Sequence, residues 1–176
     1  MAKRYPLYER TPKRTEVRYV LEDPLLRFWF RFVFPNESDL QRNRAGATFR
    51  DRIRPQLRSY YGLCYERLCR EALPDLYRRE GVTAKFDVGE YWDKRVQIDV
   101  IGLREDGWTD IGECKWGPVR SARAVAQEVR DKSAHFPNER DASLGLRAFV
   151  RRKPRVVDDS VQWHDLADVY ESTPED

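Results

Sequence analysis

The first strong apolar run of the chain follows a basic stretch and a short strand-like segment, EVRYVL. This run covers residues 25–34 and reads LLRFWFRFVF. Asp23 and Pro24 precede it, and these residue types favour the N-cap and the first position of a helix. We therefore expect a helix over residues 25–34, ended by Pro35 and Asn36, with its aromatic side chains in the core. A strand is the alternative interpretation, because the run also alternates in places.

A second apolar pattern, from about Thr48 to Arg79, has helical spacing. Apolar residues recur there at intervals of three and four, which is typical of one buried helix face. Pro55 and Pro74 are the points at which this helix could break. The polar residues 36–46 that precede it are expected to form a loop.

Strand-like segments dominate the middle of the chain. Residues 96–103 and 108–116 are the two strongest, and the turn residues REDG join them as in a β-hairpin. Pro118 ends the second strand, Ser121 is expected to cap a helix that runs to about Ser133, and residues 144–150 form a further strand. The segment WHDLADVYE fits a short helix or a strand. Helices, a hairpin, a helix and a strand in this order predict a mixed α/β fold.

Length and composition set the boundaries of this domain. The 176 residues are enough for one ordinary domain, which we expect over 23–171, with a basic N-terminal tail over 1–22 and an acidic C-terminal tail over 172–176. The three cysteines form no CxxC pair, which favours a reducing, cytoplasmic setting. The apolar run at 25–34 is too short and too charged to cross a membrane, so we expect no membrane partner.

Charge is unevenly distributed along the chain. The net charge is only +3, yet residues 42–58 hold six arginines against one acid. Within this run Arg50, Arg52 and Arg54 are candidates for contacts with backbone phosphates of DNA. A solvated surface explains such a basic run equally well.

The hairpin turn determines which residues of the two strands lie opposite one another. If Glu105, Asp106 and Gly107 form a three-residue loop, paired positions sum to 212 and Asp99 lies opposite Glu113. Opposed residues share a face, and Lys115 lies on the same face one step further along. A two-residue turn would instead place Glu113 on the other face.

Two carboxylates that lie directly opposite each other on neighbouring strands repel each other unless a cation lies between them. Hard oxygen ligands suit Mg²⁺ or Mn²⁺, so Asp99 and Glu113 are candidate metal ligands, with the backbone carbonyl of Cys114 as a third. An ion pair between Glu113 and Lys115 at the edge of the sheet is the plain structural alternative.

These residues carry a resemblance to known families. Glu66 on a helix, Asp99 in QIDV, and Glu113 and Lys115 in ECK resemble the PD-(D/E)XK nuclease superfamily. The segments VRYVLEDPLLRFWFRFVFP, YYGLCYERLCRE, GEYW, VQIDVIGL and DIGECKW resemble the C-terminal domain of archaeal-type AAA ATPases, the domain of unknown function 234.

The resemblance implies a restriction-endonuclease-like core, with a mixed central sheet flanked by helices and an N-terminal helical extension. Residues 1–20 resemble the end of a winged helix. The chain has no GxxxxGK[ST] phosphate loop, so it is expected to be a standalone relative, a fragment, or one part of a two-component system with an ATPase.

The resemblance also implies roles for individual side chains. Lys115 would orient the attacking water or stabilise charge on the phosphate, and Glu66 would reach the metal directly or through water. Gln127 on the following helix would contact a substrate phosphate, although an exposed helix glutamine is the simpler interpretation. Tyr91 and Trp92 suit base stacking, but core packing is favoured.

Three functions follow from these residues. The first is a Mg²⁺- or Mn²⁺-dependent nuclease-like domain that hydrolyses DNA phosphodiesters. The second is an inactive module of the same fold that binds DNA or docks onto an ATPase partner. The third is a structural interaction domain whose basic segments are only surface. The sequence leaves the oligomeric state open.

Overall fold

The computed structural model describes residues 1–8, 14–42 and 44–171. The predicted acidic tail, 172–176, lies outside the described residues. The elements of the N-terminal third are β1 (Ala2–Arg4), η1 (Arg14–Glu16), β2 (Arg18–Val20), α1 (Pro24–Phe28), η2 (Trp29–Val33), η3 (Phe34–Asn36), α2 (Glu37–Gln41), α3 (Ala45–Thr48) and η4 (Phe49–Ile53). The remainder contains α4 (Arg54–Arg79), β3 (Phe86–Trp92), β4 (Gln97–Arg104), β5 (Trp108–Lys115), α5 (Ala122–Ser133), β6 (Ser143–Val150), β7 (Gln162–His164) and α6 (Leu166–Tyr170).

A five-stranded mixed sheet forms the centre of the fold, in the order β3-β4-β5-β6-β7. β3, β4 and β5 pair antiparallel, whereas β5, β6 and β7 pair parallel. The helix α5 makes the crossover between the parallel strands β5 and β6, as such a connection requires. The predicted mixed α/β class is confirmed.

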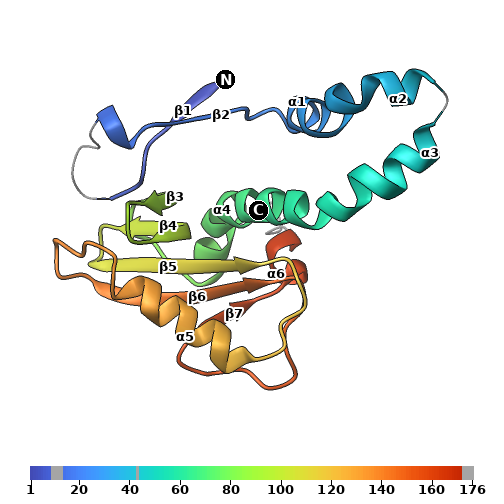
Figure 1. Ribbon diagram of the computed structural model, residues 1–176. Coiled ribbons are helices and arrows are strands. Elements are labelled where there is room, and N and C mark those ends of the chain that lie inside the picture. Colours follow the sequence, from blue (N-terminus) through green and yellow to red (C-terminus); the bar gives the residue numbers. More distant parts are fainter. Residues whose placement is uncertain (9–13, 43, 172–176) are drawn as a thin grey trace.

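The sheet is covered by helices on both faces (Figure 1). On one face, Tyr65, Leu73 and Tyr77 of α4 pack with Val100 of β4 and Phe149 of β6. On the other face, α5 packs through a cluster that consists of Val125, Ala126, Ala148, Val150, Val161 and Trp163. The long α4 and the amphipathic α5 therefore fix both faces of β4 and β5.

The N-terminal helices form an arm that runs away from the sheet and returns through α3 into α4 (Figure 1). Asp23 caps α1 as predicted, because its carboxylate accepts a hydrogen bond from the Leu26 amide at 2.8 Å. The expected loop at 36–46 is wrong: α2 and α3 occupy most of it. Short helical turns there need few apolar contacts, so the polar composition concealed them.

The aromatic residues of η2 correct a second expectation. Phe32 is fully buried against Ile53 and Tyr60, but Trp29, Phe30 and Phe34 are 44%, 54% and 57% exposed. Only one side of this helix meets α4, so most of its rings are on the surface of the described molecule rather than in the core.

The helix predicted from Thr48 to Arg79 is confirmed as η4 followed by α4. Pro55 lies in the first turn of α4, where its missing amide has no partner to lose. Pro74 lies inside α4 without ending it. The buried residues around it, including Ala72, Leu73 and Leu76, hold this part of the helix against the sheet.

The N-terminal strands pair with each other and contact the domain. β1 and β2 form an antiparallel ladder, and the guanidinium of Arg4 pairs with Glu90 of β3 at 3.0 Å. The assignment of residues 1–22 to a winged-helix-like tail stays a prediction. Within the described ranges, no helix combines the length and apolar character that crossing a lipid bilayer requires.

Candidate active site

The β4–β5 hairpin has the register that the three-residue loop predicts. Gly107 adopts φ +84°, the left-handed conformation that closes the loop. Val100 pairs with Gly112, and Leu103 with Thr109, so paired positions sum to 212. The same register continued by one residue brings Asp99 opposite Glu113.

Asp99 reaches across the hairpin. Its Oδ2 accepts a hydrogen bond from the backbone amide of Cys114 at 3.0 Å. Asp99 and Glu113 are both buried, with 7% and 4% of their surfaces exposed. Two acidic side chains are thus held together near the carboxyl end of β5, largely away from water.

Two lysines neutralise Glu113. The ammonium of Lys115 donates to Glu113 Oε1 at 2.8 Å and to Oε1 of Glu128 at 2.8 Å. Lys132 donates to the other oxygen of Glu113, Oε2. Both carboxylate oxygens of Glu113 therefore already face a positive charge.

The pKa values of the acids reflect burial and mutual repulsion. Burial raises the pKa of Glu113 to about 7, and the charge of Asp99 adds to this, while the two lysines oppose it. Burial also raises the pKa of Asp99, and the charge of Glu66 raises it further. The site thus holds more negative charge than its surroundings stabilise.

Glu66 belongs to this group although it lies on α4. Burial raises its pKa, and the charges of Glu90 and Glu113 add to the rise against the opposing charge of Arg70. Arg70 donates to the backbone carbonyl of Asp99 at 2.7 Å. The helix α4 therefore contributes both a carboxylate and an anchoring guanidinium to the same end of β4.

Lys115 remains a cation in this setting. Burial alone would lower its pKa, but its hydrogen bonds to Glu113 and Glu128 raise it overall. Its side chain is 31% exposed, so the ammonium is still accessible from solvent. A protonated, accessible lysine beside two buried carboxylates is suited to contact an anionic substrate.

The oxygen donors of this cluster fit a divalent metal only in part. Within residues 1–8, 14–42 and 44–171, no group of three or more His, Cys, Asp and Glu side chains is arranged to hold a metal ion. The oxygen donors and the repulsion between Asp99 and Glu113 fit a hard cation. Both oxygens of Glu113 already accept hydrogen bonds from lysines, so Lys132 would have to move away before a metal could bind.

Cys114 contributes its backbone rather than its thiol. Its side chain packs in the cluster on the α4 face of the sheet, on the opposite side from Glu113. Burial is the main cause that raises the pKa of the thiol, and the neighbouring Cys69 raises it further. The role of its carbonyl as a ligand stays a prediction.

The other predicted residues lie outside this cluster. Gln127 is on the exposed side of α5, where it bonds to Asp131 at 2.7 Å. Arg50 and Arg52 pair with Asp51 and Asp39, at 3.7 Å and 3.0 Å, in the N-terminal arm, and Arg54 is exposed at the start of α4. The structure does not bring these residues together with Asp99.

Tyr91 and Trp92 are core residues. They are 5% and 6% exposed, and the indole of Trp92 donates to the carbonyl of Glu16 at 3.1 Å. Such rings have no free face for a base. The packing interpretation favoured for them is supported.

Glu128 and Lys132 are site residues that sequence reasoning missed. They are four residues apart on α5, a spacing that ordinarily indicates an exposed ion pair. Their contacts with Lys115 and Glu113 arise only because α5 packs across β5. The Glu-x-x-x-Lys spacing after a capping serine was the available signal.

Two open grooves meet beside this cluster. One, of about 630 Å³, is lined by residues that include Lys115, Gly117, Arg120 and Ala124. The other, of about 530 Å³, includes Glu128, Lys132 and again Ala124. The charged side chains therefore lie where the two grooves join, within reach of a ligand.

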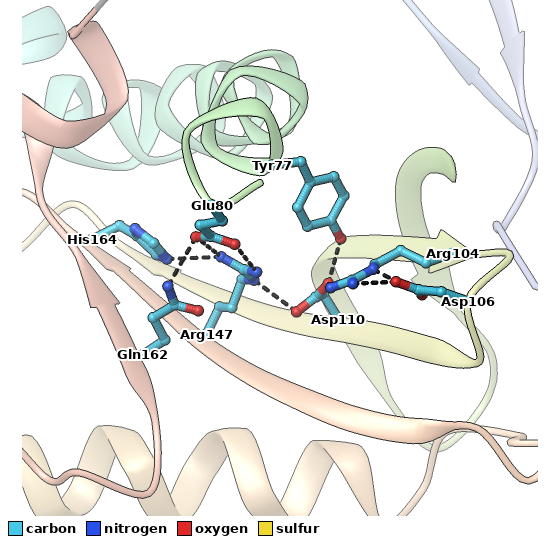
Figure 2. A network of polar contacts seen from close by, with 8 residues as sticks. All are labelled: Tyr77, Glu80, Arg104, Asp106, Asp110, Arg147, Gln162 and His164. Carbon is cyan, nitrogen blue, oxygen red and sulfur yellow. Dashed lines mark hydrogen bonds and ion pairs between the residues drawn. The ribbon is translucent and has the colours of Figure 1, made fainter. Parts of the chain in front are cut away.

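A separate polar network lies on the α4 face of the sheet (Figure 2). Arg147 of β6 is 3% exposed and donates to Asp110 at 2.7 Å and to both oxygens of Glu80 at 2.7 and 2.6 Å. Tyr77 donates to Asp110 at 2.5 Å, and Arg147 donates to Nε2 of His164 at 3.1 Å. Its buried groups are paired with one another, which indicates a structural role in joining α4 to β5, β6 and β7.

Comparisons with known proteins place these observations in context. The model of a family described as "Archaea bacterial proteins of unknown function", DUF234, matches residues 29–127. An uncharacterized protein of Methanocaldococcus jannaschii, MJECL04, is 29% identical over 121 residues, which are 68% of this chain and 27% of that protein. The chain thus spans about a quarter of the length of this curated relative. No solved structure matches the chain.

Proposed function

The chain belongs to the DUF234 family, and since that membership assigns no activity, we propose from its site that it is a metal-dependent nuclease-like domain that hydrolyses DNA phosphodiesters. One observation carries the proposal. Buried Asp99 and Glu113 lie together across the β4–β5 hairpin, with the accessible cation of Lys115 beside them.

The order of elements supports a restriction-endonuclease-like core. Glu66 lies on the helix before the sheet, Asp99 on one central strand, and Glu113 and Lys115 on the next. This is the order that the resemblance to the PD-(D/E)XK superfamily implies. The parallel strand β6 after α5 completes a mixed sheet with a helix layer on each face.

The carboxylates of Asp99 and Glu113, with the carbonyl of Cys114, would hold Mg²⁺ or Mn²⁺ in this proposal. A divalent metal bound there would lower the pKa of its bound water and place a positive charge beside the phosphate oxygens. Glu66 adds a further carboxylate from α4, and its raised pKa reflects the same excess of negative charge.

Lys115 has the central role among the chain's own groups. Its ammonium stabilises negative charge as it develops on the phosphate oxygens, or orients the water that attacks phosphorus. Glu128 and Glu113 hold this ammonium at 2.8 Å each, so its position is fixed before substrate arrives. A preorganised charge of this kind acts without reorganisation cost during the reaction.

An inactive module of the same fold is the second candidate, and one contact favours it. Lys132 occupies Glu113 Oε2, so the charge that a metal would neutralise is already partly neutralised by a side chain. Such a domain would bind DNA or dock onto an ATPase partner in the cytoplasm. The greater length of the matched relative leaves room for further domains in that protein.

Cleavage assays separate the two candidates. The protein is incubated with Mg²⁺ or Mn²⁺ and with single-stranded, duplex and branched DNA, beside Lys115→Ala and the control Lys85→Ala. Lys85 is an exposed lysine just before β3, and its carbonyl accepts a hydrogen bond from the Glu105 amide, beyond the end of β4 opposite Asp99. We expect Lys115→Ala to lower the cleavage rate by about 100-fold or more, and Lys85→Ala to leave it unchanged.

The outcomes are distinct. Metal-dependent cleavage that Lys115→Ala abolishes supports the nuclease. Salt-sensitive binding without cleavage under any of these conditions refutes the nuclease and supports the inactive module. Cleavage that persists in Lys115→Ala at the wild-type rate would assign the activity to another site or to a contaminant.

A further inference from the structure

Among the described residues, the groove at the carboxyl end of β5 is lined by basic side chains and by no acidic ones. Its walls are Arg58, Ser59 and Gly62 of α4, the loop that follows Lys115, and the first turn of α5. Lys115, Arg58 and Arg120 are its charged residues within the described part of the chain. This charge is complementary to a phosphate backbone.

Arg58 and Arg120 are available for a ligand. Both side chains are exposed, and within the described residues neither guanidinium has a hydrogen-bond or ion-pair partner. Arg58 lies against Gly117, where a side chain on residue 117 would collide with its guanidinium. The missing side chain at Gly117 therefore lets Arg58 lie over the loop beside Lys115.

Arg58 also connects the groove with the basic arm. It follows Arg54 by four residues on α4, so both project from one side of the helix. Arg54 is exposed as well. The positive charge thus continues from the groove towards the N-terminal end of α4, which suits a strand longer than one nucleotide.

An aromatic pocket of about 410 Å³ adjoins the groove. Trp116 lines both, and Tyr61 and Tyr170 line the pocket together with apolar residues of α4 and α6. Three charged residues, Arg27, Arg67 and Glu71, complete its lining, and Arg67 pairs with Glu71. Tyr61 is 44% exposed and Tyr170 67% exposed. The ring centroids of Tyr61 and Trp116 are 5.8 Å apart. Exposed rings in a pocket next to unpaired arginines are typical of sites that stack bases of a single strand.

We propose that this groove and pocket bind a single strand of nucleic acid, with its phosphates on Arg58 and Arg120 and an unpaired base against Tyr61 and Tyr170. A base inside a duplex is stacked on its neighbours and does not reach such a pocket without flipping. The inference deepens the proposed function and rests on it for the position of the reacting phosphate. It names an unpaired strand as the substrate class.

Binding without metal tests the inference apart from cleavage. Fluorescence anisotropy is measured in EDTA with a fluorescein-labelled single strand of oligo(dT), a mixed-sequence single strand, and its duplex, over a series of salt concentrations. We expect the single strands to bind more tightly than the duplex. Arg58→Ala and Arg120→Ala should each weaken single-strand binding and reduce the slope of log K against log salt by about 0.7.

Tyrosine variants test the pocket. Tyr61→Ala should weaken single-strand binding by about fivefold or more and leave duplex binding unchanged, whereas Tyr61→Phe should bind as the wild type does. Tyr170→Ala is the second variant, which tests the same pocket if Tyr61→Ala melts early by circular dichroism. Lys85→Ala is the control for loss of one exposed positive charge away from the groove.

The inference is overturned if the two arginine variants keep the wild-type affinity and salt slope, if the duplex binds as tightly as the single strands, or if none of the DNA binds. Its failure is distinguishable from failure of the proposed function. Single-strand binding through Arg58 and Arg120 without cleavage refutes only the nuclease. Cleavage that is unaffected in both arginine variants refutes only the groove.

Discussion

The ammonium of Lys132 donates a hydrogen bond to Oε2 of Glu113, from a helix that lies across the strand carrying the glutamate. Glu113 is 4% exposed, and its pKa is raised to about 7 even with this partner. Lys132 is therefore the side chain that a divalent cation would have to displace. This contact relates the two candidate functions, because it decides whether the carboxylates are open to a metal.

Replacement of Lys132 should strengthen metal binding. In Lys132→Met the competing ammonium is gone, so we expect Mn²⁺ to bind about tenfold or more tightly, because cations a few ångströms apart repel by about 1 to 4 kcal/mol. Isothermal titration calorimetry measures the affinity. In EDTA the variant should melt at a lower temperature than the wild type, and Mn²⁺ should raise its melting temperature more.

Lys85→Met is the matched control, since it removes an exposed lysine far from the carboxylates and should leave both measurements unchanged. If Lys132→Met binds Mn²⁺ no better than the wild type, Lys132 does not compete with a metal, and the proposed ligand set is wrong.

The buried Arg147 should be essential for stability. Arg147→Met leaves Asp110 and Glu80 without their main cation, and removal of one partner of a buried ion pair costs about 3 to 5 kcal/mol. Chemical denaturation followed by tryptophan fluorescence measures the loss. Arg152→Met replaces an exposed arginine in the loop that follows the same strand and should change the free energy of unfolding little.

A second substitution distinguishes charge from packing. Asp110→Asn in the Arg147→Met background removes the buried charge that has lost Arg147 and keeps only Tyr77 and Arg104 as partners, so it should restore part of the stability. If the double variant is no more stable than Arg147→Met, the loss comes from the volume and contacts of the guanidinium rather than from the charge of the Asp110 carboxylate.

The parts of the fold that follow from local chemistry could be predicted from the sequence. Asp23 and Ser121 cap helices as expected, because capping depends on a side chain and amides two or three residues away. Gly107 sets the turn, and the turn sets the hairpin register that brings Asp99 opposite Glu113. These relationships involve neighbours along the chain or across one turn.

The remaining features depend on which elements pack together. The pattern of η2 predicts an apolar helix but not that Trp29 and Phe30 remain exposed, since exposure depends on which face α4 covers. Glu128 and Lys132 become partners of Lys115 and Glu113 only through the placement of α5 on β5. Single-sequence periodicity identifies a helix face and leaves its neighbour unspecified.

His164 should make the protein acid-sensitive. Its Nε2 accepts a hydrogen bond from Arg147, and burial, followed by the charge of Arg147, lowers its pKa from 6.5 to about 4. The unfolded chain therefore binds a proton between these values that the folded chain does not. Stability from this group is complete above pH 6.5 and falls as the pH decreases towards 4, by roughly 3 kcal/mol at most.

The two histidines of the chain provide the comparison. His164→Gln should flatten the loss of unfolding free energy between pH 6.5 and 4, measured by urea denaturation at several pH values. His135→Gln should retain the wild-type profile, because His135 is exposed. Parallel profiles for the wild type and His164→Gln would mean that other groups, such as Glu80, account for the acid sensitivity.

Because Tyr77 packs over Gly102, replacing this glycine by any larger residue should lower the free energy of unfolding. A Cβ at residue 102 would collide with the Tyr77 hydroxyl and lie 3.2 Å from a methyl carbon of Leu73. Both neighbours are fully buried, so Gly102→Ala should destabilise the protein by about 1 to 3 kcal/mol, as overpacking does. Gly62→Ala is the contrasting variant: no atom lies within 4 Å of its added Cβ, and in the helix α4 it should stabilise by about 0.5 to 1 kcal/mol.

A double-mutant cycle tests the cause of the Gly102 effect. In a Tyr77→Leu background the shorter side chain leaves room for the methyl group, so the cost of Gly102→Ala should fall below its cost in the wild type. Free energies of unfolding from urea titrations of the four proteins give the coupling between the two positions. Equal costs in both backgrounds would exclude the Tyr77 contact and assign the effect to Leu73 or to the backbone of β4, whose register holds Asp99 in the candidate site.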